Sequence, residues 1–260
     1  MSELIRDAER ILRDCFFSFG QYPQATRIDE PRVAGVISGV PVPFFNGIAA
    51  TNLEDDRDID RITAMFRERQ LPFRWWLTPS TRPHDLEAKL LERGFHHTYD
   101  ANGMVADLAK VDFDAPPPRE LSIQRVADAQ QFDAWIDVFA ETFDIPPDVC
   151  AIWRDAYTFL GFDDAWVHCV GYLERKPVTI TSLLLAGDLG GIYCVGTIPE
   201  ARGRGVGRAL TLAAMKEAKE RGAARAVLQS SDMGYGVYRA IGFEDVCTMR
   251  LYDWRPEYER

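Results

Sequence analysis

Apolar and polar residues follow regular patterns in the second half of the chain, and these patterns predict short strands and amphipathic helices. Short apolar runs bounded by glycine, proline or charged residues indicate strands, whereas apolar residues three and four positions apart indicate helices. The predicted strands are 121–126, 166–173, 178–185, 191–197 and 226–230, with one or two closing strands in 243–252. The predicted helices are 127–143, 146–160, 205–221 and 233–241, with a hairpin turn at Lys176-Pro177. Strands that alternate with helices are typical of an α/β fold, here with a mixed sheet.

The first half of the chain repeats the order of the later elements. We predict a strand, a helix, a strand and a helix at 44–50, 59–69, 73–78 and 85–92. The last of these helices is followed by Gly94-Phe95, as the last helix of the second half is followed by Gly242-Phe243. A glycine can end a helix at positive φ, and the aromatic residue after it can enter the core. The shared order predicts that the two halves arose by duplication.

A run of prolines separates the two halves. The segment Asp-Ala-Pro-Pro-Pro-Arg at 114–119 interrupts the periodic pattern. Consecutive prolines forbid a helix and favour an extended chain. We therefore expect a first domain at 1–114, a proline-rich linker at 115–119 and a second domain at 120–260.

Composition narrows the classes of partner. The net charge of −10 disfavours a nucleic-acid or anionic-membrane partner, because both need a basic surface. No apolar run approaches the roughly 20 residues of a membrane span, and residues 1–13 form an amphipathic pattern rather than a signal peptide. Five cysteines without a C-x-x-C pair predict reduced, buried thiols in a cytoplasmic protein. The four histidines lack ligand spacing, so no metal site is predicted.

The hexapeptide Arg202-Gly203-Arg204-Gly205-Val206-Gly207 lies between a predicted strand and a predicted helix. Glycine has no Cβ atom, so a phosphate can approach the backbone N–H groups closely. The N-terminus of a helix adds unpaired N–H donors and about half a positive charge. Arg202, Arg204 and Arg208 add full positive charges. This junction is suited to a bound pyrophosphate.

Three phosphate-binding patterns can be compared with this hexapeptide. A P-loop needs a lysine followed by serine or threonine, and a dinucleotide fold needs G-x-G-x-x-G with a later acidic residue; both are missing here. The pattern [QR]-x-x-G-x-[GA] is matched by Arg202, Gly205 and Gly207. With the approach segment 195–201 and the Y-x-x-x-G-F motif at 238–243, residues 120–253 resemble the GNAT superfamily of acyl-CoA N-acyltransferases.

The resemblance implies the acyl-CoA N-acyltransferase fold in two tandem GNAT-like domains, with acetyl-CoA as co-substrate. It places acetyl-CoA between the strands 191–197 and 226–230, with backbone groups on the pantetheine arm and N–H groups of the hexapeptide on the pyrophosphate. Ser231 stands where many members carry an asparagine that contacts CoA. The implied binding residues are Val195, Gly196, Thr197, Arg202, Gly203, Arg204, Gly205, Val206, Gly207, Arg208 and Ser231.

The resemblance also implies that Tyr238 is the general acid, which protonates the departing CoA thiolate. The alternative is a tyrosine that only packs in the core, and Tyr235 is a second, less suitable candidate. Cys194 suggests a covalent acyl-enzyme, or else only a small buried residue. The general base stays unassigned, since the conceivable groups are also ordinary surface residues: Asp188, Glu141, Asp144, Asp232 and His168.

The first half lacks the features of the phosphate loop. Its equivalent junction, 51–58, has no glycine and four acidic side chains, which would repel a pyrophosphate. Leu90 stands where the second half has Tyr238, and Trp75-Trp76 is interpreted as packing. We interpret this half as a degenerate GNAT-like domain that lost cofactor binding.

These features predict an N-acetyltransferase that moves an acetyl group from acetyl-CoA to a primary amine in a ternary complex. A small-molecule amine is the expected acceptor. Two alternatives stay open: a protein or peptide N-acetyltransferase, and a non-catalytic acyl-CoA-binding regulator. The motifs name neither the acceptor, nor the acyl-chain length, nor the oligomeric state.

Overall fold

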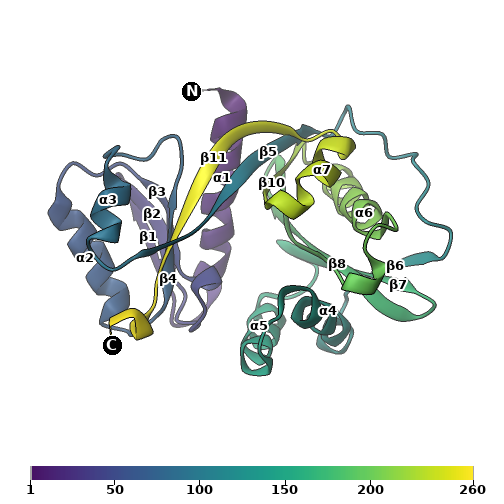
Figure 1. The fold of residues 1–260 in the computed structure, drawn as a ribbon, viewed down its shortest axis with the longest axis horizontal. Coiled ribbons are helices and arrows are strands. Elements are labelled where there is room, and N and C mark those ends of the chain that lie inside the picture. The colour runs from purple at the N-terminus through teal and green to yellow at the C-terminus, as the bar shows by residue number, and fades with distance from the viewer. Residues whose placement is uncertain (1, 260) are drawn as a thin grey trace. The chain divides into compact units, whose positions relative to one another are not determined.

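The computed structural model describes residues 2–259, which pack into two compact units (Figure 1). Unit 1 comprises Met1–Gly103 and Val246–Arg260, and unit 2 comprises Met104–Asp245. The chain passes between the units inside two long strands rather than at the proline-rich segment. No helix among residues 2–259 is long and apolar enough to cross a membrane.

Unit 2 contains a mixed sheet with the strand order β5-β10-β9-β8-β7-β6, to which β5 contributes its carboxyl-terminal end. The strands are β5 (His96–Asp107), β6 (Leu121–Arg125), β7 (Trp166–Leu173), β8 (Lys176–Ala186), β9 (Leu189–Thr197) and β10 (Arg225–Ser230). The helices are α4 (Ala129–Phe143), α5 (Pro147–Leu160), α6 (Val206–Glu220) and α7 (Asp232–Ile241), with a short 3₁₀ turn at Pro199–Ala201. The predicted elements of this half are therefore confirmed.

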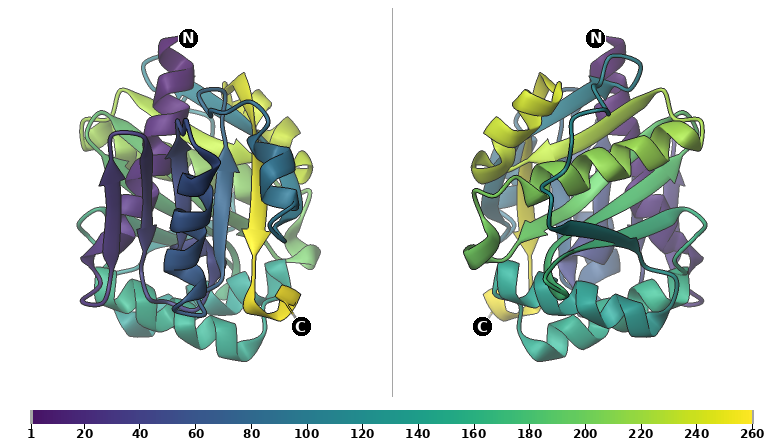
Figure 2. Two further views of the ribbon diagram at one scale, coloured as in Figure 1. Left: turned by 90° about the vertical axis from the view of Figure 1, so that its left-hand side faces the viewer. Right: turned by 90° about the vertical axis from the view of Figure 1, so that its right-hand side faces the viewer.

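In unit 2, successive side chains of the central strands pack alternately against helices on the two opposite faces of the sheet. Val167 and Cys169 of β7 join the core that includes Leu210 of α6. His168, between them in the chain, contacts the ring of Phe132 of α4 at 4.9 Å. Successive side chains of a strand point to opposite faces, so α6 covers one face of the sheet and α4 the other. This arrangement is visible in Figure 2.

Local signals set the ends of several elements in unit 2. Asp128 caps α4 by accepting a hydrogen bond from the backbone N–H of Gln131 at 2.8 Å. The β7–β8 hairpin turns at Glu174 and Arg175, which have φ of 47° and 71°. The turn predicted at Lys176-Pro177 is therefore two residues too late, because Lys176 already pairs with Leu173. Two consecutive residues at positive φ match the twist of the flanking strands.

Unit 1 contains the strands β1-β2-β3-β4-β11-β5 of the 11-stranded hydrogen-bonded order, and β5 contributes its amino-terminal part here. Its further strands are β1 (Thr26–Glu30), β2 (Val33–Ile37), β3 (Gly47–Thr51), β4 (Phe73–Leu77) and β11 (Glu244–Trp254). Its helices are α1 (Glu3–Ser18), α2 (Asp56–Arg67) and α3 (Leu86–Leu91), with 3₁₀ turns at Phe19–Gln21, Pro43–Phe45 and Pro256–Glu259. The patterns did not predict β1, β2 and β5.

The closing segment of the chain forms one strand, β11, and most of it belongs to unit 1. Leu251 pairs with Trp76 of β4 in an antiparallel ladder. Tyr252 and Trp254 lie in the unit 1 core with Phe73 and are fully buried. Residues 246–260 therefore belong to unit 1 and not to the same unit as the rest of the predicted second domain. Local periodicity could not predict this, because it does not record which distant strands pair.

The two predicted helix-ending glycines behave alike. Gly94 has φ of 78° and Gly242 has φ of 113°, a region that residues with a Cβ atom rarely adopt. Phe95 and Phe243, which follow them, are 2% and 1% exposed. The predicted helix-Gly-Phe unit is confirmed in both halves of the chain.

Candidate active site

The candidate site lies where two neighbouring parallel strands of unit 2 part. The strands β9 and β10 pair only from Leu189↔Arg225 to Gly191↔Val227, at their amino-terminal ends. Farther along β9, Gly196 and Thr197 pair with β8 on one side, and the segment 195–197 has no strand partner among the described residues on the other. A strand edge with unpaired backbone groups can accept an extended ligand as an additional strand.

A β-bulge turns strand β9 beside this opening. The register between β8 and β9 shifts between Ile180 and Ser182, and Cys194 on β9 has φ of +51°. Left-handed backbone at a residue with a Cβ atom costs of order 1–3 kcal/mol and is concentrated at functional sites. The bulge changes the direction of the strand just before the segment with the open edge.

Tyr238 of α7 lies in unit 2 next to Cys194. Burial first, and the charge on the Cys194 sulfur second, raise the pKa of Tyr238 to about 12. The side chain is 9% exposed, and its ring contacts that of Phe243 at 5.9 Å. A phenol with a raised pKa keeps its proton at neutral pH, so it can act as a proton donor but not as a base.

A glycine that the sequence patterns did not single out makes room for this ring. A Cβ atom on Gly234 would stand 2.6 Å from Cε2 and 3.3 Å from Oη of Tyr238. Gly236, in the same helix, has nothing within 4 Å of such an atom. Gly234 therefore sets where the phenol lies, and its spacing of one helical turn before Tyr238 was the available sequence signal.

The glycines of the predicted phosphate loop are needed for its backbone conformation. Gly203 and Gly205 both have φ of 74°, and Gly205 is the N-cap of α6 without a side-chain capping bond. The first N–H groups of the helix therefore lack a side-chain acceptor at this cap. Arg202 donates its Nε–H to the carbonyl of Thr197 at 3.1 Å, which ties the loop to the end of β9.

The charged side chains of the loop differ in their partners. Arg204 pairs with Glu120 at 3.2 Å, and both are exposed. Arg208, in the first turn of α6, is half-buried and forms no ion pair with any carboxylate among residues 2–259. Ser231 is exposed at the N-terminus of α7, directly after β10, and its hydroxyl does not cap the helix.

The imidazole of His168 is shielded from solvent on the opposite face of the sheet. Burial lowers the pKa of His168 to about 3, and its Nδ1 lies 2.7 Å from Oγ of Ser182. Rings of Phe132, Trp135 and Tyr157 surround it. A fully buried imidazole cannot exchange protons with bulk solvent directly, so His168 is a poor candidate for the base. The base stays unassigned.

The cysteines occupy more varied positions than expected. None of the five forms a disulfide. Cys15, Cys150 and Cys169 are buried, but Cys194 and Cys247 are only half-buried. The expectation of full burial is therefore wrong for these two residues, of which Cys194 faces the candidate site.

Unit 1 contains an equivalent pair of parallel strands, but its opening is filled by the chain itself. β3 and β4 pair at Ile48↔Trp75, and beyond that point Arg82 takes the place beside β3. The N–H of Arg82 donates to the carbonyl of Thr51 at 2.9 Å, and its carbonyl accepts from the N–H of Leu53 at 3.0 Å. The backbone edge that is open on β9 is thus occupied on β3.

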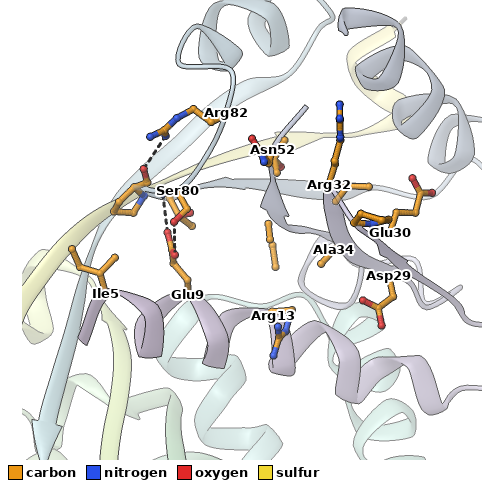
Figure 3. A pocket seen from close by; sticks show the side chains of 17 residues that line it. Ile5, Glu9, Arg13, Asp29, Glu30, Arg32, Ala34, Asn52, Ser80 and Arg82 are labelled. Atoms are coloured by element: carbon orange, nitrogen blue, oxygen red, sulfur yellow. Dashed lines mark hydrogen bonds between the residues drawn. The ribbon is translucent and has the colours of Figure 1, made fainter. Parts of the chain in front are cut away.

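A cavity of about 800 Å³ adjoins this filled opening (Figure 3). Glu9 of α1 accepts hydrogen bonds from the N–H and the hydroxyl of Ser80 at 2.9 and 2.7 Å. The cavity wall carries equal numbers of basic and acidic residues: Arg13, Arg32, Arg82, Glu9, Asp29 and Glu30. Asp55 caps α2 at the junction where unit 2 has Gly205. This combination gives no cationic cradle for a pyrophosphate.

Trp75 and Trp76 pack in unit 1, as predicted. Trp75 is fully buried and donates its indole N–H to Oγ1 of Thr51 at 2.8 Å. Trp76 is 5% exposed, and Leu90, at the position compared with Tyr238, is fully buried.

The second half of the chain is similar to a family of known proteins. Residues 128–243 match the family model described as "Acetyltransferase (GNAT) family". The chain is 31% identical over 183 residues to a mycothiol acetyltransferase of Saccharomonospora viridis, covering 64% of this chain and 60% of that protein. It is 27% identical over 242 residues to a mycothiol acetyltransferase of Pseudarthrobacter chlorophenolicus, covering 84% and 70%. The chain thus spans about three fifths of the first of these relatives.

Solved structures with the same fold cover nearly the whole chain. A GCN5-related N-acetyltransferase from Kribbella flavida has a TM-score of 0.74 at 19% identity, covering 96% of this chain and 95% of that one. A tandem GNAT protein from the clavulanic acid biosynthesis pathway has a TM-score of 0.60 at 12% identity, covering 97% and 95%. These likenesses confirm the predicted acyltransferase fold and its tandem arrangement.

Proposed function

We propose that the protein is an acetyltransferase of the GNAT family, whose model residues 128–243 match, and that it transfers an acetyl group from acetyl-CoA to a primary amine. The observation that carries the proposal is the parallel pair β9–β10, which parts beside an α6 N-terminus without a side-chain cap. An extended ligand with a pyrophosphate matches both features, and acetyl-CoA is such a ligand.

The pantetheine arm of acetyl-CoA would lie along the open edge of β9. The amide groups of the arm would hydrogen-bond to backbone groups of Val195, Gly196 and Thr197, as an added strand does. The pyrophosphate would then meet the N–H groups of residues 203–208 and the guanidinium groups of the loop. Backbone donors at a helix N-terminus bind a dianion without a lysine or a metal ion.

The transfer step would take place beside Tyr238. The lone pair of a neutral amine attacks the thioester carbonyl, a C–N bond forms and the C–S bond breaks. The thiolate of CoA leaves, and the hydroxyl of Tyr238 donates its proton to the sulfur. The proton lost by the amine nitrogen passes to solvent water or a base. Since the pKa of Tyr238 is raised to about 12, the phenol is protonated throughout the neutral range.

A small-molecule acceptor agrees best with the relatives. Both curated relatives are named for a small molecule, mycothiol. An alternative protein or peptide acceptor would be revealed by acetylation of lysate proteins, and a screen of small amines for CoA release would reveal the small-molecule activity. We expect CoA release with one class of small amines and no labelling of proteins.

A pair of glycine substitutions tests the acetyl-CoA site. Gly205→Glu places bulk and negative charge at the α6 N-cap, so acetyl-CoA binding measured by calorimetry should be lost. Gly222→Glu is the matched control, because Gly222 also has positive φ, at 94°, and a Cβ atom there meets nothing within 4 Å. The proposal is wrong if the wild-type protein binds no acetyl-CoA or if both variants bind it equally well.

A further inference from the structure

In Figure 2 the segment between β5 and β6, which contains the prolines, crosses helix α6. Nζ of Lys219 on α6 lies 5.0 Å from the ring centroid of Phe113 in this segment. A cavity of about 520 Å³ lies between residues 113–119 and the outer side of α6. Pro118 approaches the phosphate loop, at 3.8 Å from the position of a Cβ atom on Gly205. The carbonyl of Pro118 accepts a hydrogen bond from the N–H of Leu121 at 3.0 Å, which fixes the segment to the start of β6. We call this cavity the proline groove.

The charges that line the proline groove are all positive. The chain as a whole carries 40 acidic against 30 basic residues, yet no acidic residue lines this groove. Its cationic residues come from the proline-rich segment, the phosphate loop and two turns of α6: Arg119, Arg204, Arg208 and Lys216. Like Arg208, Arg119 has no carboxylate partner among residues 2–259. Arg204 pairs with Glu120 at 3.2 Å and Lys216 with Glu220 at 4.0 Å, both at the surface. Arg119 and Arg208 are therefore the cations of the groove that favour an anionic ligand most strongly.

The remaining wall of the groove is apolar. It consists of the ring of Phe113, proline rings and aliphatic side chains of the segment, β6 and α6: Phe113, Ala115, Pro116, Pro117, Pro118, Ile123, Ala209, Leu212 and Ala213. A planar ring can pack on such a surface while a charged group attached to it reaches the cations. The volume falls within the range of about 300–1,000 Å³ that holds small-molecule ligands.

We propose that the proline groove binds the 3′-phosphoadenosine part of the acyl-CoA substrate. The adenine ring packs against the prolines, and the 3′-phosphate pairs with Arg119, Arg208 and Lys216. This inference rests on the proposed function, because it extends the same ligand beyond its pyrophosphate. The segment that the sequence marks as a linker then serves as a wall of the cofactor site.

The length and direction of the groove agree with this assignment. Gly205 belongs both to the phosphate loop and to the groove lining, so the two sites are continuous. Eight residues separate Arg208 from Lys216, which corresponds to about 12 Å along an α-helix. The long side chains of Arg208 and Lys216 can converge on one phosphate that lies between these two turns of the helix. A ligand whose pyrophosphate is held at the helix N-terminus can therefore reach both cations.

Removal of the 3′-phosphate from the ligand tests the inference directly. Calorimetry would compare acetyl-CoA with acetyl-3′-dephospho-CoA on the full-length protein. We expect the wild-type protein to bind the dephospho form at least tenfold more weakly. This preference should shrink as the salt concentration rises, because exposed charge pairs are screened.

A pair of double variants tests whether the preference for the 3′-phosphate depends on the cations of the proline groove. In the double variant Arg119→Gln with Lys216→Gln, acetyl-CoA affinity should fall most of the way to that of acetyl-3′-dephospho-CoA, because only Arg208 still pairs with the 3′-phosphate. The affinity for acetyl-3′-dephospho-CoA itself should not change. The matched control is Lys110→Gln with Lys176→Gln, two exposed lysines of unit 2 outside the groove that remove the same net charge. This control should keep the full preference for the 3′-phosphate.

The outcomes separate this inference from the proposed function. If neither ligand binds, the proposed acetyl-CoA site itself fails. If both bind with equal affinity to the wild-type protein, the acetyl-CoA site stands and the proline groove is not its 3′-phosphate subsite. A preference for the 3′-phosphate that survives in full in the groove variant, or that is lost equally in the control variant, would also overturn the assignment.

Discussion

Substitution of Gly234 by alanine should displace the phenol of Tyr238 without unfolding the protein. The added Cβ atom would stand 2.6 Å from Cε2 of Tyr238, whereas carbon atoms in contact lie about 3.5–4.0 Å apart. The ring must therefore move by about 1 Å, and it moves more easily than the backbone of α7. A shift of about 1 Å at a reacting group can cost on the order of a hundredfold in rate.

The free energy of unfolding should rise in both glycine variants of α7, although the activity of Gly234→Ala falls. Replacing glycine by alanine inside a helix stabilises it by about 0.5–1 kcal/mol, because glycine loses more backbone entropy on folding. Displacement of the ring offsets part of this gain in Gly234→Ala. Gly236→Ala receives the same gain without the clash, since nothing lies within 4 Å of its new Cβ atom. The two glycines are thus a matched pair within one helix.

The assay measures CoA release at saturating and limiting acetyl-CoA, together with thermal unfolding. We expect kcat to fall about 10- to 100-fold in Gly234→Ala, with KM for acetyl-CoA nearly unchanged. Gly236→Ala should keep the wild-type kcat and melt at a higher temperature. The reasoning is refuted if Gly234→Ala also keeps the wild-type kcat, or if Gly236→Ala loses as much activity.

Three further predictions concern Tyr238, His168 and Trp254. Tyr238→Phe should lower kcat by about 10²-fold or more in CoA-release kinetics, since it removes a general acid and keeps the ring; an unchanged kcat would assign Tyr238 to packing alone. The pKa of His168 is lowered from 6.5 to about 3 on folding, so its contribution to stability is complete above pH 6.5 and is lost as the pH falls toward 3. The free energy of unfolding should decrease by up to about 1.4 kcal/mol per pH unit in that window. Urea titrations of His168→Gln should lack this component, and an identical slope would contradict it. Trp254→Ala should destabilise the protein by about 3–5 kcal/mol in denaturant unfolding, because Trp254 is fully buried; a loss below 1 kcal/mol would contradict its place in the core.

Local chemistry in the sequence was enough to locate most of unit 2 and the core of the candidate site. Glycines at positions that need positive φ, such as Gly205 and Gly242, identify themselves because few other residues tolerate that backbone. The spacing of the loop, of Tyr238 and of Gly242-Phe243 is a short-range property that a linear pattern can record. Periodicity likewise predicted the helices and strands from residue 121 to residue 241.

The missed features involve residues that are far apart in the chain. No local pattern shows that 246–254 pairs with β4, or that Arg82 fills the edge of β3. The burial of His168 among aromatic rings depends on two helices and a neighbouring strand. Nor does the sequence place the linker prolines against α6, where Arg119 and Lys216 come to line one groove.

The sequence by itself determined the phosphate loop, the phenol at 238 and the loss of both features in the first half. Backbone conformation and charge depend on the residue and its immediate neighbours, so these properties could be read in order along the chain. Only the tertiary structure decided which strand joins which sheet, how far β9 and β10 remain paired, and what lies beside the loop. Those outcomes depend on the burial of apolar surface between distant segments, which no single segment specifies.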